Sequence, residues 1–399
     1  MKTKTFSLVT AAAVALGGSA SAIVTPAGNQ TIDIAGSTAG RSTVHDNIIT
    51  QLGGAANVAI RYFRTNGATL APASASGADG AIYKGTFNSQ TVIVRTFWAG
   101  SASGVDIVSN QTSLAGKLLD LSVINSAAAN TVSQVGAGNL ISAPANAALL
   151  QSTADVAEFG YSDVKQAATP YQTNPLASQT DMFVIPFAMY RTETLTGVTN
   201  VTNQQLRSMF TGGGIAPKSL FTGLPSDRAT FVRAVGRDDD SGTRITFAAE
   251  TGIGVFTGMN QFTYTVSGSG SSANIATPVA TTPNGGYASG GDLRVVLGAT
   301  GDNCIGYLGL SDGATAAGLG AVQLSFNGTP FSQDAVKDGS YTFWSYYQSI
   351  LSSATSDANA LALHVSLETA LTSVASSNVS IKISEMQVSR QADGATVDF

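Results

Sequence analysis

The chain has 399 residues, of which 20 are basic and 25 acidic, so its formal net charge is −5 and charged residues make up only 11%. Its length exceeds the roughly 250–300 residues at which one hydrophobic core usually stops growing, which predicts two lobes or domains. The 43% of apolar residues excludes a charge-driven disordered chain, and the missing basic excess excludes a nucleic-acid binder, so a site for an anion must be built locally.

The first 22 residues have the organisation of a secretory signal peptide. Lys2 and Lys4 precede an apolar run over residues 6–16, and small residues fill positions 20–22. A membrane anchor would need about 20 apolar residues, and this run is shorter. Removing the peptide leaves 18 basic against 25 acidic residues, a net charge of −7. Cys304 is the single cysteine, which excludes a disulfide framework and a lipid-bearing cysteine at the cleavage point. A periplasmic or secreted protein is expected.

The first part of the mature chain alternates strand and helix patterns. Short β-branched and apolar segments predict strands at residues 31–34, 58–63, 81–82 and 91–98, with a helix over residues 41–52. Residues 106–156 are rich in Ala, Asn and Ser, and we expect a helix followed by an inserted, partly irregular excursion. A further short strand is expected to end at Asp163. This alternation indicates βαβ units.

The second part continues the alternation. Strands are predicted at residues 183–190, 230–235, 293–297 and 304–310, and a Ser/Gly/Thr/Pro-rich loop at residues 266–290. Helices are predicted at residues 201–213, 244–251, 341–351 and 358–375, the first of them capped by Thr202. The predicted fold class is therefore α/β, with mixed sheets flanked by helices.

The turn GRDDDSGTR, residues 236–244, connects a predicted strand to a predicted helix. The free backbone N–H groups at a helix N-terminus bind anions, and Ser241 and Thr243 add two hydroxyl donors. Arg237 can offer a planar pair of donors to a phosphate-like oxyanion. Taken alone, the turn fits an ordinary N-cap at Ser241 beside solvated charges better than an anion site, because capping residues of this kind are common.

Other chemistries fit these residues poorly. An EF-hand loop that began at Asp238 would place Gly242 at its fifth position and Ala249 at its twelfth, where oxygen ligands are required. No GxSxG segment occurs, and the only histidines are His45, which we expect on the surface of the first helix, and His364. One cysteine and two distant histidines exclude a zinc site. We therefore expect no metal, no cofactor and no catalytic residue.

Three more Gly/Ser/Thr or acidic turns follow predicted strands: IAGSTAG at residues 34–40, AGSASG at residues 99–104 and EFGYSD at residues 158–163. Turns at strand ends are where α/β proteins bind ligands. With these four turns in this order, the chain resembles the phosphate-binding proteins of bacterial ABC phosphate importers. The resemblance covers most of the mature chain, although the family usually has phenylalanine where Ala39 stands and a shorter segment before the acidic turn.

The resemblance implies a set of phosphate contacts drawn from all four turns. The hydroxyl of Thr38 and the backbone N–H of Ala39 would donate from the first turn, and Ser101, or alternatively Ser103, from the second. The whole set expected to bind the anion is Thr38, Ala39, Ser101, Asp163, Arg237, Ser241, Gly242 and Thr243. Asp239 is expected to brace Arg237, while Asp238 and Asp240 would be solvated or complement the helix N-terminus.

The resemblance also implies a type II two-lobed periplasmic-binding-protein fold with a two-segment hinge. Residues 23–182 would form lobe 1, residues 183–310 lobe 2, and residues 311–399 would return to lobe 1. Such a monomer would close over inorganic phosphate and deliver it to an ABC permease in the inner membrane. Asp163 would accept the proton of hydrogen phosphate, which fully ionised sulfate lacks.

Two other functions remain open from the sequence. A secreted structural or adhesive protein could keep the two-lobed fold without a ligand, as the Ala/Ser/Gly/Thr-rich insert suggests. A phosphatase is the weaker alternative, because these residues supply neither a metal cluster nor an activated nucleophile.

Overall fold

Residues 30–64, 78–125, 139–142 and 150–399 are described in a computed structural model of the protein. The predicted signal peptide, residues 1–22, and parts of the predicted insert at residues 106–156 lie outside these ranges. In the described part of the chain, no helix combines the length and the hydropathy needed to cross a lipid bilayer.

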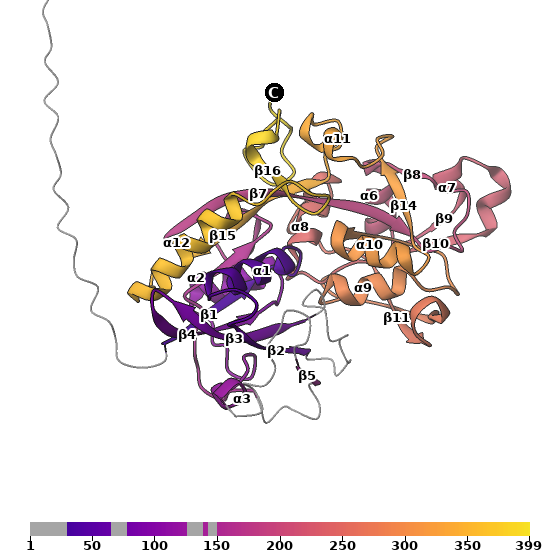
Figure 1. The fold of residues 1–399 in the computed structure, drawn as a ribbon. Helices are drawn as coiled ribbons and strands as arrows, with labels where there is room; N and C mark the ends of the chain where they lie inside the picture. Colours follow the sequence, from indigo (N-terminus) through magenta and orange to yellow (C-terminus); the bar gives the residue numbers. More distant parts are fainter. Residues whose placement is uncertain (1–29, 65–77, 126–138, 143–149) are drawn as a thin grey trace, which may run out of the picture.

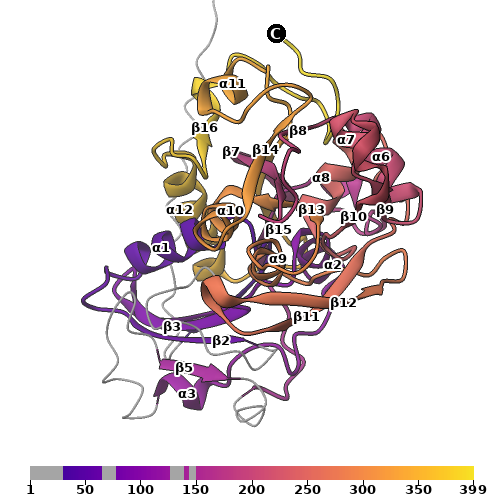
Figure 2. The same ribbon diagram turned by 90° about the vertical axis from the view of Figure 1, so that its right-hand side faces the viewer.

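One large mixed sheet extends through the molecule (Figure 1), and β11 and β12 form a separate two-stranded ribbon (Figure 2). The main order is β5-β2-β3-β4-β1-β6-β15-β7-β13-β10-β9, with β14, β8 and β16 paired off this path. The strands are β1 Gln30–Gly36, β2 Ala59–Arg64, β3 Gly80–Phe87, β4 Gln90–Phe97, β5 Asn139–Ser142, β6 Phe159–Ser162, β7 Ser178–Arg191, β8 Asn200–Val201, β9 Ile215–Pro217, β10 Phe231–Ala234, β11 Phe262–Ser267, β12 Asn274–Ala280, β13 Cys304–Gly309, β14 Val322–Phe326, β15 Trp344–Leu351 and β16 Ile381–Lys382.

Helices cover this sheet, and the prediction of an α/β fold is confirmed. In Figure 1, α1 and α12 lie together over one end, and α9 and α10 lie over the other. The helices are α1 Arg41–Gln51, α2 Ser101–Asn110, α3 Leu121–Asn125, α6 Asn203–Thr211, α7 Ser219–Thr222, α8 Gly242–Glu250, α9 Gly290–Leu297, α10 Leu310–Gly318, α11 Gln333–Lys337 and α12 Ala358–Thr372. Thr202 caps α6 as predicted, in a capping box with Gln205.

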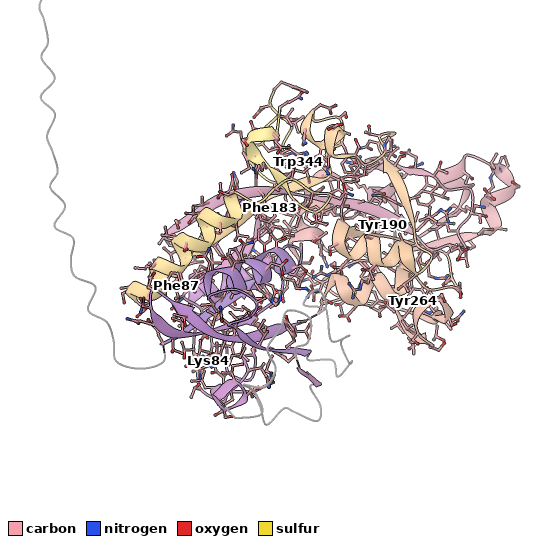
Figure 3. All side chains as sticks on the ribbon, viewed as in Figure 1. Lys84, Phe87, Phe183, Tyr190, Tyr264 and Trp344 are labelled. Atoms are coloured by element: carbon pink, nitrogen blue, oxygen red, sulfur yellow. The ribbon has the colours of Figure 1, made fainter. Side chains whose placement is uncertain are left out.

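The two lobes are joined by β7, whose 14 residues contribute to both. Its first part pairs with β15, and its last five residues, from Phe187 onward, pair with β13. Figure 3 shows Phe183 and Tyr190 at separate points along this strand, one toward each lobe. The main hydrophobic core runs along it and contains both Ile32 of β1 and Phe247 of α8. The lobes therefore share a continuous core at the hinge.

The predicted lobe boundaries at residues 182/183 and 310/311 remain a proposal. β7 passes through the first without a break. Beyond the second, α10 packs against α9 and β13, and Ala316 belongs to the same hydrophobic cluster as Leu293. This packing indicates that the chain stays in lobe 2 through α10 and returns to lobe 1 later, nearer β15.

The prediction of a strand at residues 293–297 is wrong, because this segment lies in the helix α9. Ser289 caps it, accepting a hydrogen bond from the backbone N–H of Asp292 at 3.1 Å. Leu293, Val296 and Leu297 are buried, at the i, i+3, i+4 spacing of a helix face. The β-branched pair of valines suggested a strand, and the cap outweighs this weak propensity.

The prediction of a helix at residues 341–351 is also wrong, because β15 occupies most of it. This strand lies between β6 and β7 and is buried on both faces except at Leu351. A strand buried on both faces lacks the polar–apolar alternation that reveals strands in a sequence. The aromatic residues Trp344, Tyr346 and Tyr347 fit its β geometry.

Arg95 anchors the end of the predicted insert to the sheet. Its guanidinium donates to both carboxylate oxygens of Asp33 on β1, at 2.7 and 2.6 Å, and to Asp155 at 2.6 Å. Arg95 and Asp33 are buried, so this is a paired, hydrogen-bonded charge group of the kind that interiors tolerate. The chain therefore re-enters lobe 1 at a defined place.

His45 lies inside the protein and not on its surface as predicted. It is 4% exposed, and its ring nitrogens contact the hydroxyls of Tyr62 at 2.8 Å and Tyr83 at 2.9 Å. Burial lowers the pKa of His45 to about 4. A neutral histidine can accept one of these hydrogen bonds and donate the other, so both ring nitrogens of His45 are paired in the interior.

Replacing His45 by glutamine should reduce the acid sensitivity of the fold. The pKa of His45 is about 4 in the folded protein against an ordinary value of 6.5, so the unfolded chain binds the extra proton and wild-type stability is lost as pH falls through this window. The loss from this residue is about 3 kcal/mol at most. Denaturant melts of both proteins at pH 4 and pH 8 measure it; an equal change in both would contradict the assignment.

Candidate functional site

Parallel strands bring three of the predicted turns to one edge of lobe 1. β1 pairs in parallel with both β4 and β6, so their carboxyl ends point the same way. The turns that follow them carry Thr38, Ser101 and Asp163, and all three side chains are buried. The hydroxyl of Ser101 donates to Oδ1 of Asp163, whose own backbone N–H donates to Ser101 Oγ at 3.2 Å. These turns form one half of a buried polar site.

Two glycines allow α2 to start so close to this edge. Gly100 has φ +109, a left-handed conformation that other residues rarely adopt. A Cβ on Gly104 would lie 2.5 Å from the Cα of Gly36 at the end of β1. The AGSASG turn therefore needs its glycines to set Ser101 against Asp163, whereas Ser103 is only partly buried.

The fourth turn brings lobe 2 against these residues. Ser241 is the N-cap of α8 and accepts a hydrogen bond from the backbone N–H of Arg244 at 3.3 Å. The ordinary capping role is thus present, and it leaves the hydroxyl proton of Ser241 free to be donated. A Cβ on Gly242 would lie 1.7 Å from Oδ1 of Asp163 and 2.6 Å from Oγ of Ser101. Only glycine permits this approach of the two lobes.

Arg237 is buried between the lobes and is held mainly by backbone carbonyls. Its Nε donates to the carbonyl of Tyr287 at 2.9 Å, and its Nη2 to that of Ala288 at 2.8 Å. Nη2 also lies 3.4 Å from the hydroxyl of Thr38 in lobe 1. Thr38, Ser101, Asp163, Arg237 and Gly242 therefore converge where the lobes meet.

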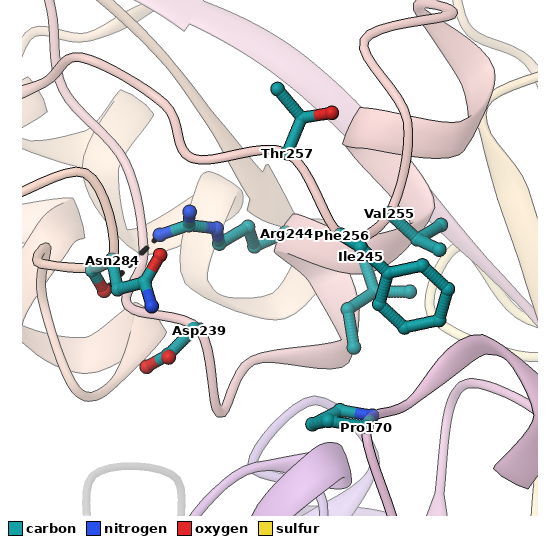
Figure 4. Close-up of a pocket in the computed structure, with 8 residues that line it drawn as sticks. All are labelled: Pro170, Asp239, Arg244, Ile245, Val255, Phe256, Thr257 and Asn284. Carbon is teal, nitrogen blue, oxygen red and sulfur yellow. Dashed lines mark hydrogen bonds between the residues drawn. The ribbon is translucent and has the colours of Figure 1, made fainter.

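The predicted brace between Asp239 and Arg237 is wrong. Asp239 is exposed and lines a cavity with Arg244 and Asn284 (Figure 4). Its backbone N–H donates to the carbonyl of Asn284 at 3.2 Å. The carbonyls of Tyr287 and Ala288 take the bracing role, because they lie on a loop that folds back over the turn.

The other aspartates of the turn line a cavity of about 240 Å³ between the lobes. Asp238 and Asp240 face it together with Trp98 of lobe 1. Burial raises the pKa of Asp238 to about 6, against the opposing effect of Arg237. One oxygen of Asp238 is buried without a hydrogen-bond partner among the described residues. Both aspartates are partly buried, so the prediction that they would be solvated holds only in part.

Asp163 is the buried carboxyl of the site, and its pKa is raised. Burial raises this pKa to about 7, while the positive charge of Arg237 opposes the shift. The neighbouring side chain of Ser37 lowers this pKa slightly, in the same direction as Arg237. A carboxyl with a pKa near neutrality can accept a proton from a bound anion or hold one itself.

Ala39 and Thr243 directly follow Thr38 and Gly242 in the chain. The backbone N–H of Ala39, expected to face the anion, donates to Oγ of Ser37 at 3.1 Å. Thr243 is buried in the first turn of α8, beside Gly242. Their roles as ligand contacts remain predictions. In the described part of the chain, no group of three or more His, Cys, Asp or Glu side chains is placed to hold a metal ion.

Comparisons with known proteins give distant structural similarities. No family model matches the chain, and no curated protein matches its sequence. A structure from Clostridium perfringens with bound phosphate, described as a phosphate ABC transporter substrate-binding protein, matches with 11% identity and a TM-score of 0.47, covering 89% of this chain and 100% of that one. An ABC-type phosphate transport receptor from Vibrio cholerae matches with 12% identity and a TM-score of 0.44, covering 84% and 93%. PstS from Borrelia burgdorferi matches with 13% identity and a TM-score of 0.40, covering 86% and 93%.

Proposed function

We propose that this protein is an exported solute-binding protein that captures inorganic phosphate between two closing lobes. One observation carries the proposal: a buried guanidinium, a buried carboxyl and the N-terminus of a helix converge between the lobes at Arg237, Asp163 and Gly242. The guanidinium and the helix N-terminus attract an oxyanion. The carboxyl selects an anion that still carries a proton.

A binding role suits these residues better than catalysis. His364 contacts the hydroxyl of Ser349 at 2.7 Å, but both are buried between β15 and α12. Glu368 approaches the same nitrogen, Nε2, at 3.7 Å, so it cannot orient the ring as the third member of a catalytic triad does. His45 is held by two tyrosines. The phosphate would therefore be bound and released unchanged.

The transport role forms part of the same proposal. The signal-like first 22 residues and the converging anion contacts support an exported protein that passes phosphate to an ABC permease. We further propose that it acts as a monomer in the periplasm.

Calorimetry of the mature protein with phosphate, arsenate and sulfate tests the ligand. We expect micromolar phosphate binding, about −8 kcal/mol, with arsenate similar and sulfate far weaker. Phosphate at 100 times its dissociation constant should also add about 2.7 kcal/mol to the free energy of unfolding. Equal binding of sulfate, or no phosphate binding, would refute the proposal; the latter would favour a structural protein.

Replacing Asp163 by asparagine should relax the discrimination against sulfate. The amide can donate a hydrogen bond to an unprotonated oxygen, where the carboxylate would oppose it with lone pairs. The pKa of Asp163 is raised to about 7, so its protonated form becomes dominant as pH falls below 7. The protonated carboxyl can donate a hydrogen bond to sulfate, so the sulfate affinity of the wild type should increase as pH falls. Sulfate titrations at pH 6 and pH 8 measure both effects. Unchanged selectivity in the variant would remove Asp163 from this role.

A further inference from the structure

Arg244, the last residue of the GRDDDSGTR turn, is buried, and in the contacts described its guanidinium is bonded only to backbone carbonyls. Its Nη1 donates to the carbonyls of Arg237 and Asn284, each at 3.2 Å, and its Nη2 to that of Pro283 at 2.8 Å. Figure 4 shows its guanidinium directed toward Asn284, beside a cavity of about 140 Å³. Arg244 therefore ties the turn to the loop at residues 283–288.

The far end of that loop holds the guanidinium of Arg237. Pro283 and Asn284 are bonded to Arg244, while Tyr287 and Ala288, only three or four residues further on, supply the two carbonyls that orient Arg237. The backbone of Tyr287 adds two hydrogen bonds to the turn, with Gly236 at 3.0 Å and Asp238 at 3.2 Å. The loop is thus hydrogen-bonded to Arg244 at one end and to Arg237 at the other.

Two further residues fit this bridge. Gln261 donates through Nε2 to the carbonyl of Arg237 at 3.0 Å and to that of Gly285 at 2.7 Å. A Cβ on Gly286 would lie 2.4 Å from the carbonyl carbon and oxygen of Arg237, so the loop packs directly on the backbone of the turn. Arg244, from α8, and Gln261, from the segment just before β11, donate to the same carbonyl of Arg237.

We propose that Arg244 is a positioning residue for the anion contact of Arg237, an inference that rests on the proposed phosphate site. By fixing the loop, it holds the carbonyls of Tyr287 and Ala288 where they orient the Arg237 guanidinium toward Thr38. Neutral carbonyls replace the expected aspartate brace, so Nε and Nη2 of Arg237 are oriented by backbone groups and not by a bonded carboxylate. Arg244 itself does not contact the anion, because its donors are directed to carbonyls and Asp239 borders its cavity.

The test compares Arg244→Met, Arg244→Lys and Gln261→Met with Arg228→Met, which removes an exposed arginine as a matched control. Three quantities are measured: phosphate affinity by calorimetry, the ligand-free melting temperature, and the ¹⁵N NMR signal of the Arg237 Nε–H, identified by its absence in Arg237→Lys. A residue that only stabilises the fold would change the melting temperature without moving the Arg237 signal.

We expect Arg244→Met to weaken phosphate binding at least tenfold and to shift or broaden the Arg237 signal, even without phosphate. Arg244→Lys should restore part of both properties, Gln261→Met should act in the same direction, and Arg228→Met should change neither. A folded Arg244→Met with an unchanged Arg237 signal would overturn the inference. If Arg244→Met does not fold, an unchanged Arg237 signal in both Arg244→Lys and Gln261→Met would overturn it. If wild-type protein fails to bind phosphate, the proposed function falls, while the ligand-free signal still decides the positioning role.

Discussion

Replacing Arg237 by alanine should abolish phosphate binding at micromolar concentrations. Truncating one partner of a buried, hydrogen-bonded charge interaction costs about 2–5 kcal/mol, which at about 1.4 kcal/mol per tenfold is a loss of roughly 30-fold to several thousand-fold. The loss should lie toward the upper end, because Arg237 is 3% exposed and bridges to Thr38 of the other lobe. Calorimetric titration with phosphate measures it.

Arg237→Lys is the matched control. It keeps the positive charge but loses the planar fork that reaches Tyr287 and Ala288 together. We expect intermediate affinity, with the ligand-free melting temperature close to that of the wild type. Phosphate binding by Arg237→Ala within a factor of three of the wild type would place the anion elsewhere.

Replacing Gly242 by alanine should weaken phosphate binding because it destabilises the closed state, in which the two lobes meet. The added methyl would lie 1.7 Å from Oδ1 of Asp163 and 2.6 Å from Oγ of Ser101, both in the other lobe. Overpacking of this kind costs about 1–3 kcal/mol. Because the clash arises only when the lobes meet, the cost should appear mainly as lost affinity.

Gly318→Ala is a suitable control for this variant, since a Cβ there would meet nothing within 4 Å. Small-angle scattering with and without phosphate reports the closure directly. We expect compaction in the wild type and in Gly318→Ala, and reduced compaction in Gly242→Ala. Full closure of Gly242→Ala with unchanged affinity would show that the lobes do not meet at this glycine when phosphate is bound.

Local patterns predicted the elements that carry the site. β1, β4, β6 and β10 lie where short apolar runs placed them, and the turns that follow were recognisable by their Gly, Ser, Thr and Asp content. Ser241 and Thr202 cap helices as their residue types indicate. Each of these features depends on a few neighbouring residues, so it can be predicted from the chain alone.

Two elements and one side chain were predicted wrongly from the sequence. The aromatic residues of β15 are buried between β6 and β7 and show no alternation, and the valines of α9 suggested the wrong element. His45 is polar but lies among tyrosines. For β15 and His45 the environment comes from strands distant in the sequence, whereas α9 is decided by its own cap, Ser289.

The sequence by itself determined that Arg237, Ser241 and Gly242 stand at a strand-to-helix turn suited to an anion, and that three similar turns follow other strands. Only the tertiary structure decided what orients Arg237. Asp239 is its near neighbour in the chain, yet it is exposed, and the bracing groups are carbonyls about 50 residues further on. Every residue has the same backbone carbonyl, so no residue pattern predicts which carbonyls will bind Arg237. Their position depends on the path of the loop, which is hydrogen-bonded to Arg244 and Gln261.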